Sequence, residues 1–281
     1  MSAQPAELRP GIALLSGLPI WQATPVFEPV PGGRTNDNYR VTAGGRRYFA
    51  RIGMDLPHHH VSRANEARCH RLAAEAGVAP EVIHASDGVL VTGFIEGRTL
   101  VHTDPVDDPM LGLVAEALQK IHFHPAPRDL NPFDPVDICR KNLADLPADF
   151  LPQRRRRLLA SILDAIPPLK PRCLIHADLI PENFIIAGGR AYIVDWEYAG
   201  YGDPAVDIAQ VIVLFGLDQR QTELLVRRYG AVDMAAVRAL GPVLAARETL
   251  WCEIQAHFVG VRGDLEEYRA LCWKRLEGAG S

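Results

Sequence analysis

One short segment contains residues whose types and spacing could transfer a phosphoryl group. In His176-Ala-Asp178, the aspartate is followed five positions later by Asn183, and Asp195 comes twelve residues after that asparagine. A loop carboxylate can accept a hydroxyl proton, while an amide and a second carboxylate can hold Mg²⁺ against a triphosphate. Asp and Asn also occur at turns only to cap or bend the chain. The complete spacing, HxDxxxxN followed by an aspartate after a hairpin, nevertheless favours phosphoryl transfer.

Short strands must position these residues. Apolar runs at 173–176, 184–187 and 191–194 surround the turn Ala187-Gly-Gly-Arg190, which is typical of a hairpin. Asp195 directly follows the last run. The hairpin is therefore expected to return Asp195 to the loop that contains Asp178.

The rest of the chain divides into two regimes. Residues 26–94 are strand-like with glycine turns, and they predict a hairpin, a helix over 61–76 and a second hairpin. Helical spacing of apolar residues dominates afterwards. The predicted helices span 110–122, 153–166, 206–215, 222–229, 234–258 and 265–276. We expect an α+β, bilobal fold with an N-terminal lobe over 1–95, a C-terminal lobe over 96–281 and a hinge at about 94–101.

The cation that would bind the phosphates in the N-terminal lobe has to be arginine. The chain has 26 Arg but only 4 Lys, and no lysine precedes Lys120. A lobe that binds a triphosphate for phosphoryl transfer needs a cation on its third strand, oriented by a glutamate of the next helix. Arg51, in the predicted strand Tyr-Phe-Ala-Arg-Ile, occupies that strand position, and Glu66 lies on the following helix. A planar guanidinium can bind phosphate and carboxylate together. The alternative is an ordinary surface ion pair of little energetic weight.

The segment HADLIPENF, followed by VDWEYAGYGDPAVDIA, resembles the aminoglycoside phosphotransferase and choline kinase superfamily, most closely its choline/ethanolamine kinase branch. The resemblance covers residues 24–276 and implies a kinase-like fold. It also implies that Asp178 is the catalytic base, that Asn183 and Asp195 bind Mg²⁺, and that His176 braces the loop. Arginine at position 51 fits the same branch.

The resemblance further implies where ATP binds. Residues 31–39 resemble the nucleotide loop written GGxTNxxY in choline-kinase-like proteins, although a Gly-Gly turn alone is usually structural. Backbone groups of the hinge would bind adenine. The expected ATP-binding residues are Gly32, Gly33, Thr35, Asn36, Arg51, Glu66, Phe94, Ile95 and Glu96.

The acceptor site is less specified by the sequence. A cationic acceptor requires an aromatic wall and a carboxylate, and the candidates are Glu197, Trp251 and Tyr268. Trp251 matches a choline-pocket tryptophan of the family. Where the family has a second aromatic residue, three positions earlier, this chain has Glu248. Each aromatic candidate could instead belong to the core. The run 58–60, His-His-His, is expected to be a loop before a helix rather than a metal site.

Composition excludes several classes of protein and leaves others open. The formal charge of −4 argues against nucleic-acid binding, and no run of apolar residues is long enough to cross a membrane. Five cysteines without a CxxC spacing suggest reduced thiols in a cytoplasmic protein. The partner is expected to be a small-molecule alcohol: choline, ethanolamine or a related amino alcohol. Thiamine, an aminoglycoside or a sugar-like alcohol remain alternatives, as does an inactive nucleotide-binding module. The oligomeric state is not predicted.

Overall fold

The protein is described here from a computed structural model that covers residues 10–31 and 36–278. The strands are β1 (Val26–Val30), β2 (Asp37–Ala43), β3 (Arg46–Ile52), β4 (Val82–Ser86), β5 (Val89–Gly93), β6 (Arg98–Thr99), β7 (Cys173–Ile175), β8 (Phe184–Ala187), β9 (Arg190–Ile193) and β10 (Gly200–Gly202). The helices are α1 (Pro10–Ser16), α2 (Arg63–Glu75), α3 (Asp108–Phe123), α4 (Pro135–Asp145), α5 (Gln153–Asp164), α6 (Ala205–Leu214), α7 (Gln219–Tyr229), α8 (Met234–Phe258) and α9 (Leu265–Gly278). Two short 3₁₀ helices, η1 (Pro57–His59) and η2 (Pro181–Asn183), complete the set.

The N-terminal part is a five-stranded antiparallel sheet in the order β1-β2-β3-β5-β4. Gly44 and Gly45 both have positive φ in the β2–β3 turn, a conformation that glycine adopts at little cost. One face of the sheet buries its own small apolar core, which includes Leu15, Tyr39 and Val91. The two predicted hairpins are therefore present, and the register of β3 places Arg51 opposite Asn38.

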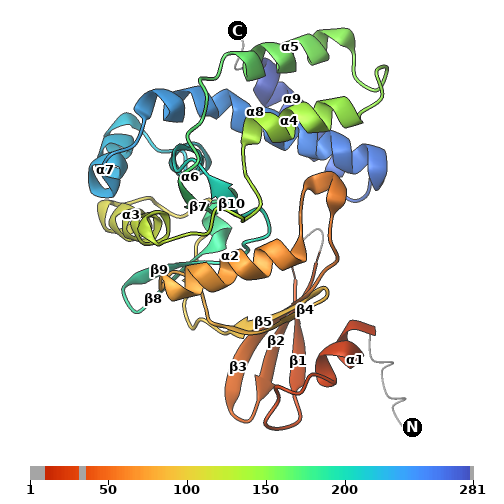
Figure 1. Ribbon diagram of the computed structural model, residues 1–281, viewed down its shortest axis with the longest axis vertical. Helices are drawn as coiled ribbons and strands as arrows, with labels where there is room; N and C mark the ends of the chain where they lie inside the picture. Colours follow the sequence, from red (N-terminus) through yellow and green to blue (C-terminus); the bar gives the residue numbers. More distant parts are fainter. Residues whose placement is uncertain (1–9, 32–35, 279–281) are drawn as a thin grey trace.

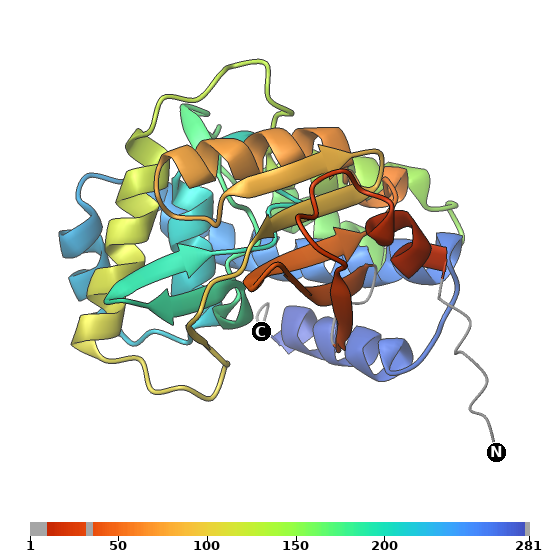
Figure 2. The same ribbon diagram turned by 90° about the horizontal axis from the view of Figure 1, so that it is seen from below.

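Helix α2 lies beside β4, between the sheet and the helical part of the molecule (Figures 1 and 2). It begins after Ser62, whose side chain accepts a hydrogen bond from the backbone N–H of Asn65, and Gly77 follows its end with positive φ. Its C-terminal half contributes Cys69 and Ala73 to the large core of the helical part. The helix that presents Glu66 is thus packed against both parts of the protein.

The C-terminal part is mainly helical, with two small antiparallel sheets, β6-β8-β9 and β10-β7 (Figure 1). Its core surrounds the fully buried Trp196. The predicted α+β class is confirmed. The division at residues 94–101 stays a prediction, and we use it to name the small lobe (10–95) and the large lobe (96–278).

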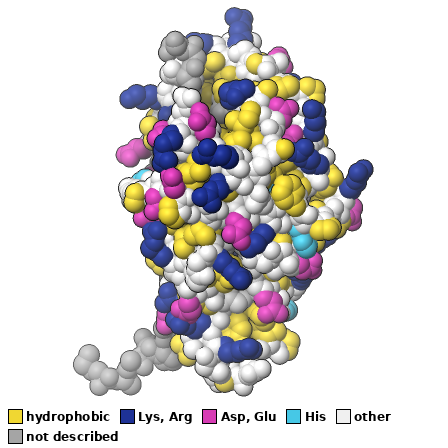
Figure 3. Space-filling model, turned by 90° about the vertical axis from the view of Figure 1, so that its left-hand side faces the viewer, with side chains coloured by type: hydrophobic (Ala, Val, Ile, Leu, Met, Phe, Trp, Pro, Cys, Tyr) yellow, Lys and Arg dark blue, Asp and Glu magenta, His cyan; other side chains and the backbone are white. Residues whose placement is uncertain are grey.

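Sequence patterning missed two helices, α1 and α4. Helix α4 was missed although its signals are present: Asp134 caps it, Pro135 begins it, and Val136, Cys139 and Leu143 recur at helical spacing. No helix within residues 10–31 and 36–278 is long and apolar enough to cross a membrane. On one face of the molecule, acidic side chains lie interspersed with Lys and Arg (Figure 3).

Candidate active site

The loop that follows β7 holds a buried, neutral histidine. The imidazole of His176 is fully buried, and burial lowers its pKa to about 4. Its Nδ1 accepts the backbone N–H of Asp178 at 3.2 Å, and its Nε2 lies 3.0 Å from the carbonyl oxygen of Val194. A neutral ring protonated at Nε2 satisfies both bonds. His176 therefore joins the loop to the end of the β8–β9 hairpin.

The three residues predicted for catalysis and metal binding lie around this histidine. The side-chain amide of Asn183 donates to the backbone carbonyl of Asp178 at 2.8 Å. The backbone N–H of Val194 donates to the carbonyl of Asn183 at 2.9 Å, which places Asp195 next to the loop. Ala177 and Asp195 both have positive φ, an unusual conformation for side-chain-bearing residues that concentrates at functional sites.

The two carboxylates share an environment that favours their neutral forms. The pKa of Asp178 is raised to about 6, chiefly by burial; Arg247 opposes the rise, and the charges of Glu197 and Glu248 contribute to it. Burial and the charge of Glu197 raise the pKa of Asp195 to about 7, and Asp178 adds to this rise while Arg51 opposes it. Carboxylates held together at this cost are typical of a site that receives a cation.

The residues present fit a magnesium ion. Asn183 is buried, and because its amide nitrogen is bound to the Asp178 carbonyl, its side-chain oxygen points elsewhere. Asp195 contributes carboxylate oxygens, and hard oxygen donors are what Mg²⁺ prefers. Among the described residues no group of three His, Cys, Asp or Glu could hold a metal ion. A magnesium site here would therefore need the side-chain oxygen of Asn183 as well as the carboxylate of Asp195.

Helix α6 holds the Asp178 loop in place, through residues that the sequence analysis did not select. The buried carboxylate of Asp207 accepts the backbone N–H groups of His176 and Ala177, at 2.8 and 2.9 Å, and contacts the ring of His122. Burial would raise the pKa of Asp207, but these hydrogen bonds and the charge of His122 outweigh it and the pKa is lowered. Gln210, one turn later, bonds the backbone at both Ala177 and Leu179. The three-residue spacing of an Asp and a Gln in an apolar helix was the available signal.

Arg51 lies between the lobes and reaches the site. It is 5% exposed, and its guanidinium pairs with Glu66 on α2 and with Asp195 of the large lobe, the latter at 3.1 Å. The Arg51–Glu66 pair is therefore buried rather than a surface ion pair. The structure thus brings the predicted cation, its helix partner and the predicted metal carboxylate together.

A second arginine, Arg63, extends this network, and sequence reasoning missed it. Its guanidinium donates to Glu66 and Glu197, both at 2.9 Å, and to the side-chain oxygen of Asn36 at 2.7 Å. Asn36 in turn donates to Glu197 at 3.1 Å. Glu197, a predicted substrate residue, is therefore engaged by the small lobe, and its role with substrate stays a prediction. Gly32, Gly33 and Thr35 lie outside the described residues.

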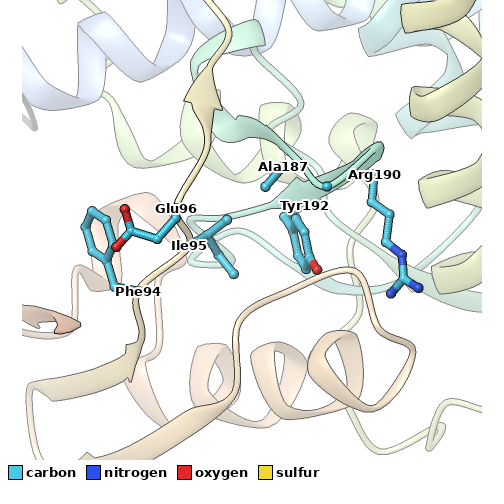
Figure 4. A pocket seen from close by; sticks show the side chains of 7 residues that line it. Phe94, Ile95, Glu96, Ala187, Arg190 and Tyr192 are labelled. Atoms are coloured by element: carbon cyan, nitrogen blue, oxygen red, sulfur yellow. The ribbon is translucent and has the colours of Figure 1, made fainter. Parts of the chain in front are cut away.

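The predicted hinge lines a cavity of about 320 Å³. Phe94, Ile95 and Glu96 form one side, and the β8–β9 hairpin forms the other through Ala187, Gly188, Arg190 and Tyr192 (Figure 4). Phe94 is covered by the guanidinium groups of Arg40 and Arg47. The hairpin residues were not predicted, because their proximity to the hinge depends on the fold rather than on a local pattern.

The aromatic candidates for the acceptor pack together on α8 and α9. Trp251 and Tyr268 contact the same small apolar cluster of Cys252, Leu265 and Cys272. The indole N–H of Trp251 donates to the hydroxyl of Tyr198 at 3.0 Å, and the hydroxyl of Tyr268 donates to Glu248. One turn earlier on α8, Arg247 donates to the carbonyl of Ala177 at 3.0 Å. This face of α8 therefore lies next to the Asp178 loop.

Comparison with known proteins agrees with this architecture. The chain is 30% identical to a choline/ethanolamine kinase family protein from Mesorhizobium loti, whose crystal structure aligns with a TM-score of 0.71 over 95% of this chain and 92% of that one. It is 27% identical over 212 residues to protein LicA of Haemophilus influenzae, a match that covers 70% of this chain and 61% of LicA, less than two thirds of that relative. A shorter match, 35% over 66 residues, is to thiamine kinase of Salmonella paratyphi B and covers 24% of this chain and 23% of the kinase.

The family model of the phosphotransferase enzyme family matches residues 26–240. This range includes the sheet, α2, the hinge and the whole Asp178 loop. The resemblance predicted from residues 174–207 and the predicted kinase-like fold are both confirmed. The chain belongs to the phosphotransferase enzyme family.

Proposed function

We propose that the protein transfers the γ-phosphate of ATP to the hydroxyl group of a small amino alcohol such as ethanolamine or choline. The observation that carries the proposal is the meeting of Asp178, Asn183 and Asp195 at one point, where Arg51 of the small lobe also arrives. A candidate base, two oxygen donors and a phosphate-binding cation are the parts that phosphoryl transfer requires.

In the proposed reaction, the acceptor hydroxyl oxygen attacks the γ-phosphorus as the bond to the β-phosphate oxygen breaks. Asp178 takes the hydroxyl proton, and ADP leaves with the electron pair of the broken bond. Arg51, held by Glu66, neutralises charge on the phosphates. Mg²⁺, held by Asn183 and Asp195, would supply further positive charge at the triphosphate.

The base of the nucleotide is assigned to the cavity between the hinge and the β8–β9 hairpin. The cavity has walls from both lobes, with Ile95 on one side and Tyr192 on the other (Figure 4). Its volume of about 320 Å³ is in the range of small-ligand sites. A nucleotide bound there would extend its phosphates toward Arg51.

An amino alcohol is the acceptor that the surroundings of Asp178 favour. Glu248 and Glu197 are close enough for their charges to raise the pKa of Asp178, against a larger opposing effect of Arg247, so two carboxylates beside the base could attract a cationic acceptor. Trp251 and Tyr268 add aromatic surface beside Glu248. A cationic nitrogen gains from both features. The choline/ethanolamine kinase family protein from Mesorhizobium loti is a relative whose name agrees with this choice.

The test is ADP release by the purified chain with ATP and Mg²⁺ across a panel of ethanolamine, choline, thiamine, an aminoglycoside and a sugar alcohol. We expect turnover with the amino alcohols. Turnover with thiamine or the antibiotic alone would replace the acceptor class. A metal-dependent shift of the melting temperature by ATP, without turnover on any acceptor, would instead indicate an inactive nucleotide-binding module.

A further inference from the structure

The three consecutive histidines of the small lobe all contact the large lobe. His58 stacks on Phe258 with ring centroids 3.6 Å apart, and Nε2 of His60 lies 2.9 Å from the side-chain oxygen of Asn142 on α4. His59, between them, contacts α8. The run is therefore an interface between the lobes, and its use is not explained by the chemistry at Asp178.

The turn that presents these rings is fixed by the backbone. Pro57 begins η1, and His60 ends it in the left-handed conformation with φ 60°. Leu56 and Val61 close the turn with two backbone hydrogen bonds, of 3.0 and 3.1 Å. Because these bonds hold the chain on either side, the turn fixes the backbone at His59, and the contacts of the ring with Gln255 and Trp251 fix its side chain.

His59 makes the contact that bears on the acceptor. It is 6% exposed, its Nε2 lies 2.7 Å from the side-chain oxygen of Gln255, and its ring stacks on the indole of Trp251 with centroids 5.0 Å apart and planes 27° apart. The indole N–H of Trp251 is bound to the hydroxyl of Tyr198. One face of the indole is thus supported by the small lobe, while its N–H is held by the large lobe.

We infer that His59 is a positioning residue of the acceptor site, which fixes the orientation of the Trp251 indole from the small lobe. The inference rests on the proposed function, in which Trp251 forms part of the acceptor wall. It adds that the wall is built from both lobes. An indole held in its binding orientation before the acceptor arrives loses less freedom on binding, so its support contributes to acceptor affinity.

The inference predicts a specific division of kinetic effects. Without the His59 ring, the indole gains alternative orientations and acceptor binding weakens, whereas the nucleotide contacts at the hinge and at Arg51 are untouched. A stacked aromatic pair contributes enough for a change of about five- to tenfold in affinity. We therefore expect His59→Ala to raise KM for the acceptor about five- to tenfold and to change KM for ATP less than about twofold.

Two variants separate positioning from general cohesion of the lobes. His59→Phe keeps a ring against Trp251 and loses the bond to Gln255, so it should restore acceptor KM to within about threefold of the unchanged protein. His60→Ala breaks an interlobe hydrogen bond of similar length that ends on Asn142 of α4 and includes no atom of Trp251. It should leave acceptor KM unchanged, even where it lowers the melting temperature.

The experiment measures KM for ethanolamine and for ATP in the full chain and in the three variants, once the unchanged chain has shown turnover. A spectroscopic readout uses the fluorescence of each protein minus that of its Trp251→Phe counterpart. The indole emission should change in His59→Ala and not in His60→Ala. Unchanged acceptor KM in His59→Ala, or an equal rise in His60→Ala, would overturn the inference. Absence of turnover in the unchanged chain would instead refute the proposed function, and the emission difference would still test the contact.

Discussion

At Asp178, the requirements of catalysis and of stability oppose each other. Burial raises the pKa of this carboxyl group to about 6, from an ordinary value near 4. Folding therefore makes the protonated form of Asp178 more favourable than it is in the unfolded chain, whereas a base must be ionised to accept a proton. Activity should rise as the pH increases through about 6. Stability should move the other way, because above the ordinary pKa the ionised group is more costly in the folded state than in the unfolded one.

Asp178→Asn removes this cost and should stabilise the protein while it inactivates it. Because Asp178 is partly exposed, solvent screens part of this cost and leaves about 1–2 kcal/mol, which corresponds to an increase in melting temperature of about 2–6 °C at pH 8. The gain should shrink as the pH falls from 6 toward 4, where both states are protonated. Differential scanning fluorimetry from pH 4.5 to 8 measures it. A variant less stable than the unchanged protein at pH 8 would contradict this account of the burial.

Arg51 provides a second prediction at the scale of single residues. Its planar fork reaches Glu66 and Asp195 at once, and a lysine has one nitrogen that cannot keep both contacts and bind phosphate. Arg51→Lys should raise KM for ATP by about tenfold or more and leave acceptor KM within about twofold. Arg46→Lys, an exposed change on the same strand, is the matched control. Equal effects of the two changes on KM for ATP would contradict the assignment.

The sequence was most informative about residues that lie close together along the chain. One loop and one hairpin carry Asp178, Asn183 and Asp195, so these residues meet. The turn residues of that hairpin can be recognised in the amino-acid sequence. Arg63 and Glu197 are 134 residues apart. Nothing local pairs them, so the sequence could suggest Glu197 as a polar residue near the centre but could not identify its partner.

Among the elements, helix α6 holds the Asp178 loop through Asp207 and Gln210. Asp207→Asn replaces one acceptor oxygen by an N–H₂ group that faces backbone N–H groups, and removes the charge that pairs with His122. Loss of one partner in a buried network costs about 3 kcal/mol or more. The melting temperature should fall by about 6 °C or more, and kcat should fall with it. Asp218→Asn, at the exposed start of α7, keeps a good helix cap and should change the melting temperature little. A fall no larger than that of this control would refute the role of α6.

The hinge depends on one close approach. A Cβ at Gly97 would lie 2.6 Å from the carbonyl oxygen of Ile186 and 2.9 Å from the Cβ of Ala187, which lines the cavity. Gly97→Ala should therefore push the hinge away from β8 and raise KM for ATP several-fold, as measured by steady-state kinetics. Gly93→Ala, four residues earlier, meets no atom within 4 Å and serves as the control. Indistinguishable KM values would show that the cavity does not bind the nucleotide.

Elements were predictable where periodicity and turn residues agreed. The long apolar pattern of α8 and the glycine turns of the hairpins indicated both type and place. Helix α4 carries a cap, an initial proline and apolar residues at helical spacing, so it could have been predicted from the sequence and was overlooked. Strand β10 has three residues and exists because β7 lies beside it. Such a strand is determined by tertiary packing, which a local window of sequence does not contain.

At the scale of the whole molecule, the candidate site exists only where the lobes meet. Arg51 contacts Asp195 across 144 residues of chain, and Asn36 contacts Glu197 across 161. The early observation that no lysine precedes residue 120 acquires its meaning here, because the cation at this junction has to be an arginine. Composition predicted the residue type, and only the folded chain supplies its contacts.

The most direct test of this account is phosphoryl transfer itself. Ethanolamine or choline is incubated with ATP and Mg²⁺, and the phosphorylated product is followed by phosphorus NMR for the unchanged chain, for the unchanged chain with EDTA, and for Asp178→Asn. Nucleotide affinity is measured in parallel by calorimetry. We predict product only from the unchanged chain with Mg²⁺, and a loss of at least about a hundredfold in Asp178→Asn with nearly unchanged ATP affinity. Sustained product formation by Asp178→Asn would contradict the central claim.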